Sequence, residues 1–212
     1  MPRSAEQRGD ATPFLPERRS LKALREAAAG CRGCHLYAPA TQTVFGEGLK
    51  RAKLALVGEM PGDREDRAGR VFVGPAGREL DKALERVGID RRDVYITNVV
   101  KHFKFEERGK RRIHQTPKKF EVDACLPWLR AELDVLHPEA LVLLGATAGK
   151  ALLGSGFRLR DARGHPVESD LAPLVTATAH PSAILRTRDN EARYAAREAL
   201  RADLQLVADA LS

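Results

Sequence analysis

The chain has 212 residues and a mass of 23.3 kDa, and 43% of its residues are hydrophobic and 31% charged. This composition is typical of a globular protein with one domain, or with one domain and a small second one. No apolar stretch approaches the ~20 residues of a membrane span, and no apolar run follows the charged N-terminus. We therefore expect a cytoplasmic protein that is neither exported nor inserted in a membrane.

The balance of charge favours a partner that carries phosphates. Lys and Arg number 36 against 29 acidic residues, which gives a formal net charge of +7. Nucleic acid is such a partner, because each phosphate that a basic side chain neutralises releases counterions. The three cysteines are an odd number in a chain without an export signal. They favour thiolate chemistry or a metal over disulfides.

The order of the predicted elements indicates the fold class. Residues 1–20 have no periodic apolar pattern and predict a loose N-terminal arm before a single domain over residues 21–212. The rest alternates between buried strands and amphipathic helices. We expect, in chain order, a helix at 21–29, a strand at 53–57, a helix at 76–87, a strand at 94–100, a helix from about 117 to 136 capped by Thr116 with Pro117 in its first turn, a strand at 140–144, a helix at 146–153, a strand at 174–179 and a helix at 190–211. This alternation predicts an α/β fold with a mostly parallel sheet and helices on both faces.

Polar side chains follow the ends of the predicted strands. Because ligands of such sheets bind outside the carboxyl ends of the strands, we expect these side chains to converge at one edge. The residues concerned are Glu59, Asp63, Asn98, Lys101, His102, His180 and Ser182.

Each candidate has a functional and a structural interpretation. The carboxylate of Glu59 can stabilise a cation or orient water, or it can belong to an acidic helix N-terminus. Asn98 both donates and accepts and therefore suits the imide edge of a pyrimidine, but it can also be a turn residue. His180 can donate to a carbonyl or an anion, although a single histidine is more often structural. Phe45 and Phe72 lie among glycines and can stack on a base or pack in the core.

The cysteines suggest a metal site. Cys31 and Cys34 form a C-x2-C pair, and Cys125 is the third cysteine. His102 is the strongest candidate for a fourth ligand, because it ends a strand and Cys125 lies on the helix that follows. The tight turn after Cys34 should direct His35 away. The spacing alone leaves both Zn²⁺ and an iron–sulfur cluster open.

These motifs resemble those of the iron–sulfur uracil-DNA glycosylases, often called family 4. The first motif is Gly58-Glu59-Met60-Pro61-Gly62 together with Phe72-Val73-Gly74. The other matching segments are Val44-Phe45-Gly46-Glu47-Gly48, Thr97-Asn98-Val99-Val100-Lys101 and His180-Pro181-Ser182. The resemblance extends from about Leu21 to Leu211.

Two departures from family 4 resemble one branch of it, UdgX, whose members become covalently attached to the uracil-containing DNA on which they act. His102 stands where the family has Cys, and the stretch Gly109-Lys110-Arg111-Arg112-Ile113-His114 precedes the next helix. Met60 departs from both groups, because UdgX proteins have Gln there and family 4 often has Ala. Any side-chain contact of that Gln is absent in this chain.

The resemblance implies a three-layer α/β/α sandwich around a four-stranded parallel sheet. It also implies a structural [4Fe-4S] cluster on Cys31, Cys34, His102 and Cys125, with Zn as the alternative. The implied partner is uracil-containing DNA, preferably single-stranded, bound by a monomer. In a bacterial cell such a protein would act at the nucleoid.

The resemblance further implies a role for each site residue. Glu59, His114 and His180 would be catalytic, and uracil would contact Met60, Asp63, Phe72, Asn98 and His180. DNA would contact Lys110, Arg111, Arg112, Ser182 and Arg186. Neutral His114 would attack C1′ of the sugar and stay bonded to it, which predicts a single-turnover enzyme. Two alternatives stay open: a multiple-turnover family 4-like enzyme that uses water, and a non-catalytic DNA-binding module held together by a metal.

Overall fold

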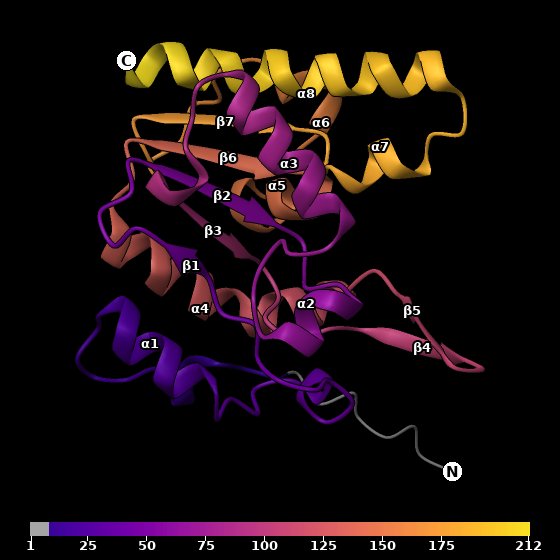
Figure 1. Ribbon diagram of the computed structural model, residues 1–212. Helices are drawn as coiled ribbons and strands as arrows, with labels where there is room; N and C mark the ends of the chain where they lie inside the picture. Colours follow the sequence, from indigo (N-terminus) through magenta and orange to yellow (C-terminus); the bar gives the residue numbers. More distant parts are fainter. Residues whose placement is uncertain (1–8) are drawn as a thin grey trace.

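Four parallel strands form the centre of the molecule, which a computed structural model describes over residues 9–212 (Figure 1). They are β2 (Leu54–Gly58), β3 (Val94–Asn98), β6 (Ala140–Leu144) and β7 (Leu174–Thr178). The four predicted strands are therefore confirmed, although β3 ends two residues earlier than expected. The sheet order is β1-β3-β2-β6-β7, in which β1 (Glu47–Gly48) is an unpredicted antiparallel edge strand.

Helices cover both faces of this sheet, as the sequence predicted. Alternate side chains of β2 point to opposite faces. Leu54 and Leu56 pack with α3 (Pro75–Arg86) and α8 (Asn190–Leu211), whereas Ala55 and Val57 pack with the α1 and α4 side. Figure 1 shows α3 and α8 on one side of the sheet and α1 (Leu21–Ala28) and α4 (Lys119–Leu136) on the other. The result is the expected three-layer α/β/α arrangement.

The helices that have an amphipathic pattern in the sequence form close to where we predicted them. The start of α4 is the exception. The helix begins at Lys119 with Lys118 as its N-cap, so the predicted cap at Thr116 is wrong. Glu121 decides the start, since its carboxylate accepts a hydrogen bond from the backbone N–H of Lys118 at 2.5 Å. The helix α5 (Ala146–Leu153) agrees with the prediction.

Several short elements have no clear signal in the sequence. They are the helices α2 (Asp63–Ala68), α6 (Leu159–Ala162) and α7 (Ser182–Arg186), and the 3-10 turns Thr12–Phe14, His35–Tyr37 and Arg91–Asp93. None of the helices exceeds six residues, and isolated helices of this length are not stable in water. Their formation depends on packing against the sheet and its neighbours.

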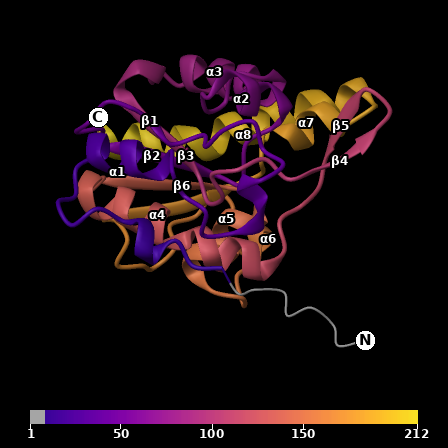
Figure 2. The ribbon, with the colours of Figure 1, turned by 90° about the horizontal axis from the view of Figure 1, so that it is seen from below.

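The polar stretch 101–117 contains a β-hairpin. Strands β4 (Phe105–Arg108) and β5 (Arg111–His114) pair antiparallel, with Phe105 opposite His114. Gly109 has φ +59°, the left-handed conformation that a tight hairpin turn requires. Figures 1 and 2 show the hairpin projecting from the body of the molecule on the side where α7 lies.

Part of the predicted N-terminal arm packs on the domain. Residues 1–8 lie outside the described residues, but Ala11 is buried and its N–H donates to the carbonyl of Ala124 at 2.9 Å. A Cβ on Gly33 would lie 2.7 Å from the Asp10 carbonyl oxygen, so this segment runs directly over the loop between Cys31 and Cys34. The arm is therefore not loose around residues 9–11. Over residues 9–212, no helix is both long and apolar enough for a membrane span.

Candidate functional site

A cavity of about 500 Å³ lies beside the carboxyl ends of β2, β3 and β7. This volume suits a small-molecule or single-base ligand. The cavity brings together most of the residues that the sequence predicted for the site: Met60, Asp63, Phe72, Asn98, His114, His180, Ser182 and Arg186. Met60 is otherwise buried in the apolar core.

Phe72 forms one wall of the cavity. Its backbone adopts φ +52°, which is unusual for a residue other than glycine. The ring lies 5.7 Å from the His180 ring, and a Cβ on Gly58 would come within 2.7 Å of it. Gly58 is thus required at the end of β2, because any side chain there would displace the aromatic ring. The ring is placed to stack on a flat ligand. Phe45, the other candidate, is instead buried in edge-to-face contact with Trp128.

Asn98 ends β3 and is 1% exposed. Its Oδ1 is buried and has no hydrogen-bond partner among the described residues. A buried amide oxygen without a partner is energetically costly, so its presence in a cavity indicates that a ligand donates to it. The amide therefore offers an acceptor and a donor side by side.

His180 is a neutral hydrogen-bond donor. Burial, together with repulsion from Arg186 and His114, lowers its pKa to about 4. The backbone N–H of Ser182 donates to Nδ1 at 3.2 Å, and the Ser182 hydroxyl lies 2.8 Å from the same nitrogen. Because Nδ1 accepts, the single proton of the neutral ring is on Nε2. His180 therefore offers an N–H to a ligand without carrying a charge.

Glu59 and His114 meet although they lie on separate elements. Glu59 follows β2, and its Oε1 lies 3.5 Å from Nε2 of His114 at the end of β5. The hydroxyl of Thr147, which sequence reasoning missed, donates to the other carboxylate oxygen. Burial and the nearby charge of Arg186 lower the pKa of His114. The Glu59 carboxylate raises it, but the net shift is downward. The imidazole is therefore largely neutral at pH 7.

A buried ion pair supports the end of β3. Lys101 and Glu132 are both inaccessible to solvent and bonded to each other, and Lys101 Nζ also donates to the Asn98 carbonyl at 2.7 Å. Glu132 accepts from Tyr95 and Thr97 as well. Lys101 thus holds the backbone of Asn98 and does not enter the cavity. Sequence reasoning missed Glu132, whose only signal is an acid among the apolar residues of α4.

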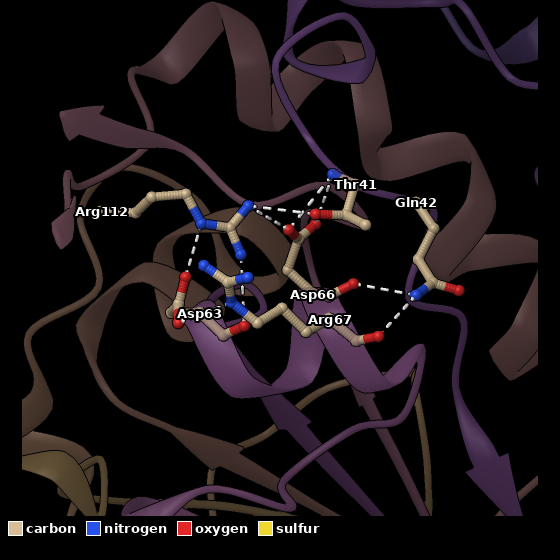
Figure 3. A network of polar contacts seen from close by, with 6 residues as sticks. All are labelled: Thr41, Gln42, Asp63, Asp66, Arg67 and Arg112. Carbon is tan, nitrogen blue, oxygen red and sulfur yellow. Dashed lines mark hydrogen bonds and ion pairs between the residues drawn. The ribbon is translucent and has the colours of Figure 1, made fainter. Parts of the chain in front are cut away.

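Arg112 has a different environment from the one we predicted. Its Nε donates to Asp63 at 2.5 Å, and its NH1 donates to Asp66 at 2.7 Å and to Thr41 at 3.1 Å (Figure 3). Only 12% of its side chain is exposed. These partners occupy the guanidinium, and the predicted contact of Arg112 with DNA stays a prediction. Asp63 lines the cavity, but its carboxylate is bound to Arg112 and Arg67, which also lowers its pKa.

Three other predicted DNA contacts are exposed, whereas Ser182 is half-buried. Lys110 and Arg111 are exposed at the turn of the hairpin, and Arg186 is exposed at the cavity, where it donates to the Ser182 hydroxyl at 2.9 Å. Of these cations, Arg186 lines the cavity, together with Arg64.

The three cysteines lie close together behind the site. Burial, and to a smaller extent charge on Cys34 and Cys31, raises the pKa of the Cys125 thiol to about 12. Donors point at two of the sulfurs: the indole N–H of Trp128 lies 3.2 Å from Cys31, and the backbone N–H of Lys101 lies 3.3 Å from Cys125. Such N–H···S bonds are typical of metal-bound thiolates, since a neutral thiol is a weak acceptor.

His102 presents a bare nitrogen. Its Nε2 lies 2.9 Å from the Thr43 hydroxyl, which donates its own proton to the Ala28 carbonyl. Nε2 must therefore be the donor, so Nδ1 carries the lone pair, and Nδ1 is buried without a partner. Burial lowers the pKa of this ring to about 4. A neutral imidazole with a free Nδ1 fits a metal ligand. His35 pairs with Glu121 at 3.1 Å, and its expected orientation away from the cysteines stays a prediction.

The candidate ligands are not gathered around one point in this structure. Among residues 9–212, no three His, Cys, Asp or Glu side chains form a group that could hold one ion.

Comparison with known proteins identifies the family. Residues 45–205 match the model of the uracil DNA glycosylase superfamily. The chain is 38% identical over 174 residues to a type-4 uracil-DNA glycosylase of Thermotoga maritima, which covers 82% of this chain and 87% of the relative. A type-4 uracil-DNA glycosylase of Pyrobaculum aerophilum is also 38% identical, over 78% of this chain and 85% of its own. A third type-4 uracil-DNA glycosylase, from Sulfurisphaera tokodaii, is 34% identical over 78% of this chain and 76% of its own length. The chain therefore belongs to the uracil-DNA glycosylase superfamily.

Proposed function

We propose that the protein excises uracil from DNA by cleaving the bond between the base and C1′ of its sugar. The observation that carries the proposal is the buried, unpaired Oδ1 of Asn98 in the cavity. Three relatives that share 34% to 38% of their residues with this chain are type-4 uracil-DNA glycosylases, and they support the same reaction.

The side chains of the cavity match the hydrogen-bonding edge of uracil. Asn98 Oδ1 accepts from uracil N3–H, and its amide nitrogen donates to O4. Cytosine offers an acceptor at N3 and an amino group in place of O4, so both contacts would be repulsive. Phe72 stacks on the base. A base can reach the cavity only after it has left the helical stack of the DNA. A single strand has no pair to break, so we propose that it is the preferred substrate.

Charge changes on two atoms during cleavage. As the C1′–N1 bond breaks, its electron pair goes to the uracil, and the anion is stabilised by the Nε2–H of His180 at O2. The sugar becomes oxocarbenium-like, and the Glu59 carboxylate stabilises that positive charge. Lys110, Arg111 and Arg186 neutralise the phosphates on either side. We propose that a monomer does this work.

We further propose that Cys31, Cys34, Cys125 and His102 hold a [4Fe-4S] cluster. The N–H donors aimed at two sulfurs and the bare Nδ1 of His102 support it. Zinc is less well supported, because Zn²⁺ needs all ligand atoms within about 2.0–2.3 Å of one ion. The cluster would supply a cross-link between the N-terminal loop, the end of β3 and α4, and no step of cleavage passes through it.

Excision is tested with a single-stranded oligonucleotide that carries one uracil, beside a thymine control. We expect alkali-labile sites in the uracil strand alone. Asn98→Ala should lose at least ~100-fold in rate, as loss of one preorganised polar contact does. A wild-type protein that holds its iron and binds the oligonucleotide without attacking uracil would instead indicate a DNA-binding module.

A second candidate function concerns what captures the sugar. The type-4 relatives favour water as the nucleophile. The placement of His114 beside Glu59 favours covalent capture, because a largely neutral imidazole has a lone pair to donate to C1′. The new N–C1′ bond makes the ring cationic, and the proton on its other nitrogen then passes to Glu59 or water. Uracil leaves with the electrons of the old bond.

A denaturing gel separates the two outcomes. Capture predicts a uracil-dependent band of protein joined to DNA that survives boiling in SDS and is absent in His114→Ala. Water predicts abasic DNA without that band, and more product than enzyme. Ile113→Ala, a change to the exposed neighbour in β5, is the control variant.

A further inference from the structure

The hairpin β4–β5 carries His114 but has little support of its own. A two-stranded hairpin is marginally stable by itself in water. Three of the four residues of β5 are exposed, and Arg112 is the exception. Within β5, Arg112 is therefore the side chain that is most enclosed by the rest of the molecule.

Arg112 joins β5 to two other segments. We call Arg112, Asp63, Asp66 and Thr41 the Arg112 cluster (Figure 3). The guanidinium donates to both carboxylates, which lie on α2, and to the hydroxyl of Thr41. Asp66 is fully buried and also accepts from the Thr41 backbone N–H at 3.0 Å. An arginine fits this site because its planar fork donates in several directions at once.

Aromatic side chains complete the attachment. The Arg112 guanidinium lies 4.9 Å from the ring centre of Phe105 and 5.3 Å from that of Phe103. Phe103 is 1% exposed, and its ring also lies 6.1 Å from the ring of His114. One buried ring thus contacts both Arg112 and His114. The two residues are two apart in β5 and share a face of the strand.

We propose that Arg112 is a positioning residue, which fastens the hairpin to α2 and so holds His114 in the cavity beside Glu59. A phosphate contact is the competing role for an arginine in this basic stretch. It would require Arg112 to leave four oxygen acceptors and to strip the buried Asp66 of its cation. The chemical role of His114 in the cavity rests on the proposed function, whereas the position of its side chain does not depend on that function.

The test compares Arg112→Ala with Arg108→Ala, which removes the same charge from an exposed position on β4. The first measurement is hydrogen exchange of residues 105–114 in the protein without DNA. The second is affinity for a thymine-containing single strand over a range of salt. The third is the single-turnover rate on the uracil strand at saturating DNA.

We expect Arg112→Ala to speed hairpin exchange at least tenfold and to slow the saturated reaction at least tenfold. Affinity for the thymine strand and its salt dependence should stay within twofold of wild type. Arg112→Lys keeps the charge and loses the planar fork. Its hairpin exchange and its saturated rate should lie between those of wild type and Arg112→Ala. Arg108→Ala should leave hairpin exchange and the saturated rate near wild type.

The opposite pattern would overturn the proposal. A phosphate contact predicts unchanged exchange, weaker binding and a salt slope reduced by about one. If Arg112→Ala does not fold, the double variant Arg112→Leu with Asp66→Asn removes both buried charges and carries the same expectations. Hydrogen exchange needs no substrate, so a wild type inactive on uracil would refute the proposed function without deciding the role of Arg112.

Discussion

His102 and His180 occupy similar surroundings and have opposite chemistry. Burial lowers the pKa of each to about 4, so both rings are neutral at pH 7. His102 donates from Nε2 to Thr43 and keeps a bare Nδ1, whereas His180 accepts at Nδ1 from Ser182 and keeps a proton on Nε2. One neighbouring residue thus fixes the tautomer, and the tautomer decides whether the ring offers a lone pair to a metal or a proton to a substrate.

The largest expected effect follows from removing the lone pair of His102. If the proposed cluster is bound, His102→Ala should lose most of the iron and should unfold at a temperature ~10 °C lower or more, because binding free energy is part of folding free energy. Iron analysis and a thermal melt measure this. His102→Cys, which supplies a thiolate, should keep the iron. Full iron content in His102→Ala would show that this ring is not a ligand.

Removing the donor of His180 should affect the reaction and leave the iron in place. His180→Ala should slow single-turnover excision ~10²–10³-fold, the usual loss for a donor that stabilises a developing anion. The measurement is the rate at saturating uracil DNA. Affinity for a thymine strand should stay near wild type. A variant that binds uracil DNA more weakly but cleaves it at the normal saturated rate would contradict this role.

The same burial predicts a pH dependence of stability. The pKa of His180 is lowered in the folded state, so the unfolded chain takes up a proton more readily. Above pH 6.5 the ring is neutral in both states, so burying it costs no protonation free energy. The free energy of unfolding decreases as the pH falls from 6.5 towards 4. Between pH 7 and pH 5 this residue should account for ~2 kcal/mol.

Urea unfolding of wild type and His180→Gln at both pH values checks this linkage. Glutamine does not titrate, so the variant should lose less stability on acidification than wild type. Equal losses in the two proteins would mean that His180 takes up its proton as readily in the folded state as in the unfolded chain.

The smallest effects concern the residues that fix the tautomers. Thr43→Val removes the acceptor of His102 Nε2–H and should weaken iron retention ~10-fold, at the low end for such second-sphere changes. Ser182→Ala should cost less than ~10-fold in excision rate, because the backbone N–H at that position still donates to His180 Nδ1. Iron loss under a chelator and single-turnover kinetics are the two measurements. If Ser182→Ala lost more excision rate than His180→Ala, Ser182 could not be acting through His180.

Local sequence patterns were sufficient to predict the residues at the edge of the sheet. Buried strands have continuous apolar runs, and in a parallel sheet their carboxyl ends share one edge. Asn98 and His180 could be placed together for that reason. The role of Glu132 could not be predicted, because nothing in the pattern of α4 shows that this acid pairs with the distant Lys101.

The hairpin shows where prediction from local pattern stops. Its strands are polar and short, and their register depends on the turn at Gly109 and on contacts with α2. Arg112 lies in a run of three basic residues, which indicated phosphate binding for all three. Only the fold places Asp63 and Asp66 beside one of them, 46 or more residues away in the chain.

The sequence by itself determined the layered α/β fold, the edge where the site forms and the residue types that meet there, because those depend on apolar periodicity and strand order. The tertiary structure alone decided which nitrogen of each histidine is free, which arginine is buried and which carboxylate His114 faces. Those properties depend on hydrogen-bond partners and burial supplied by distant segments. Their energies change with distances of a few tenths of an ångström, which residue spacing along the chain does not specify.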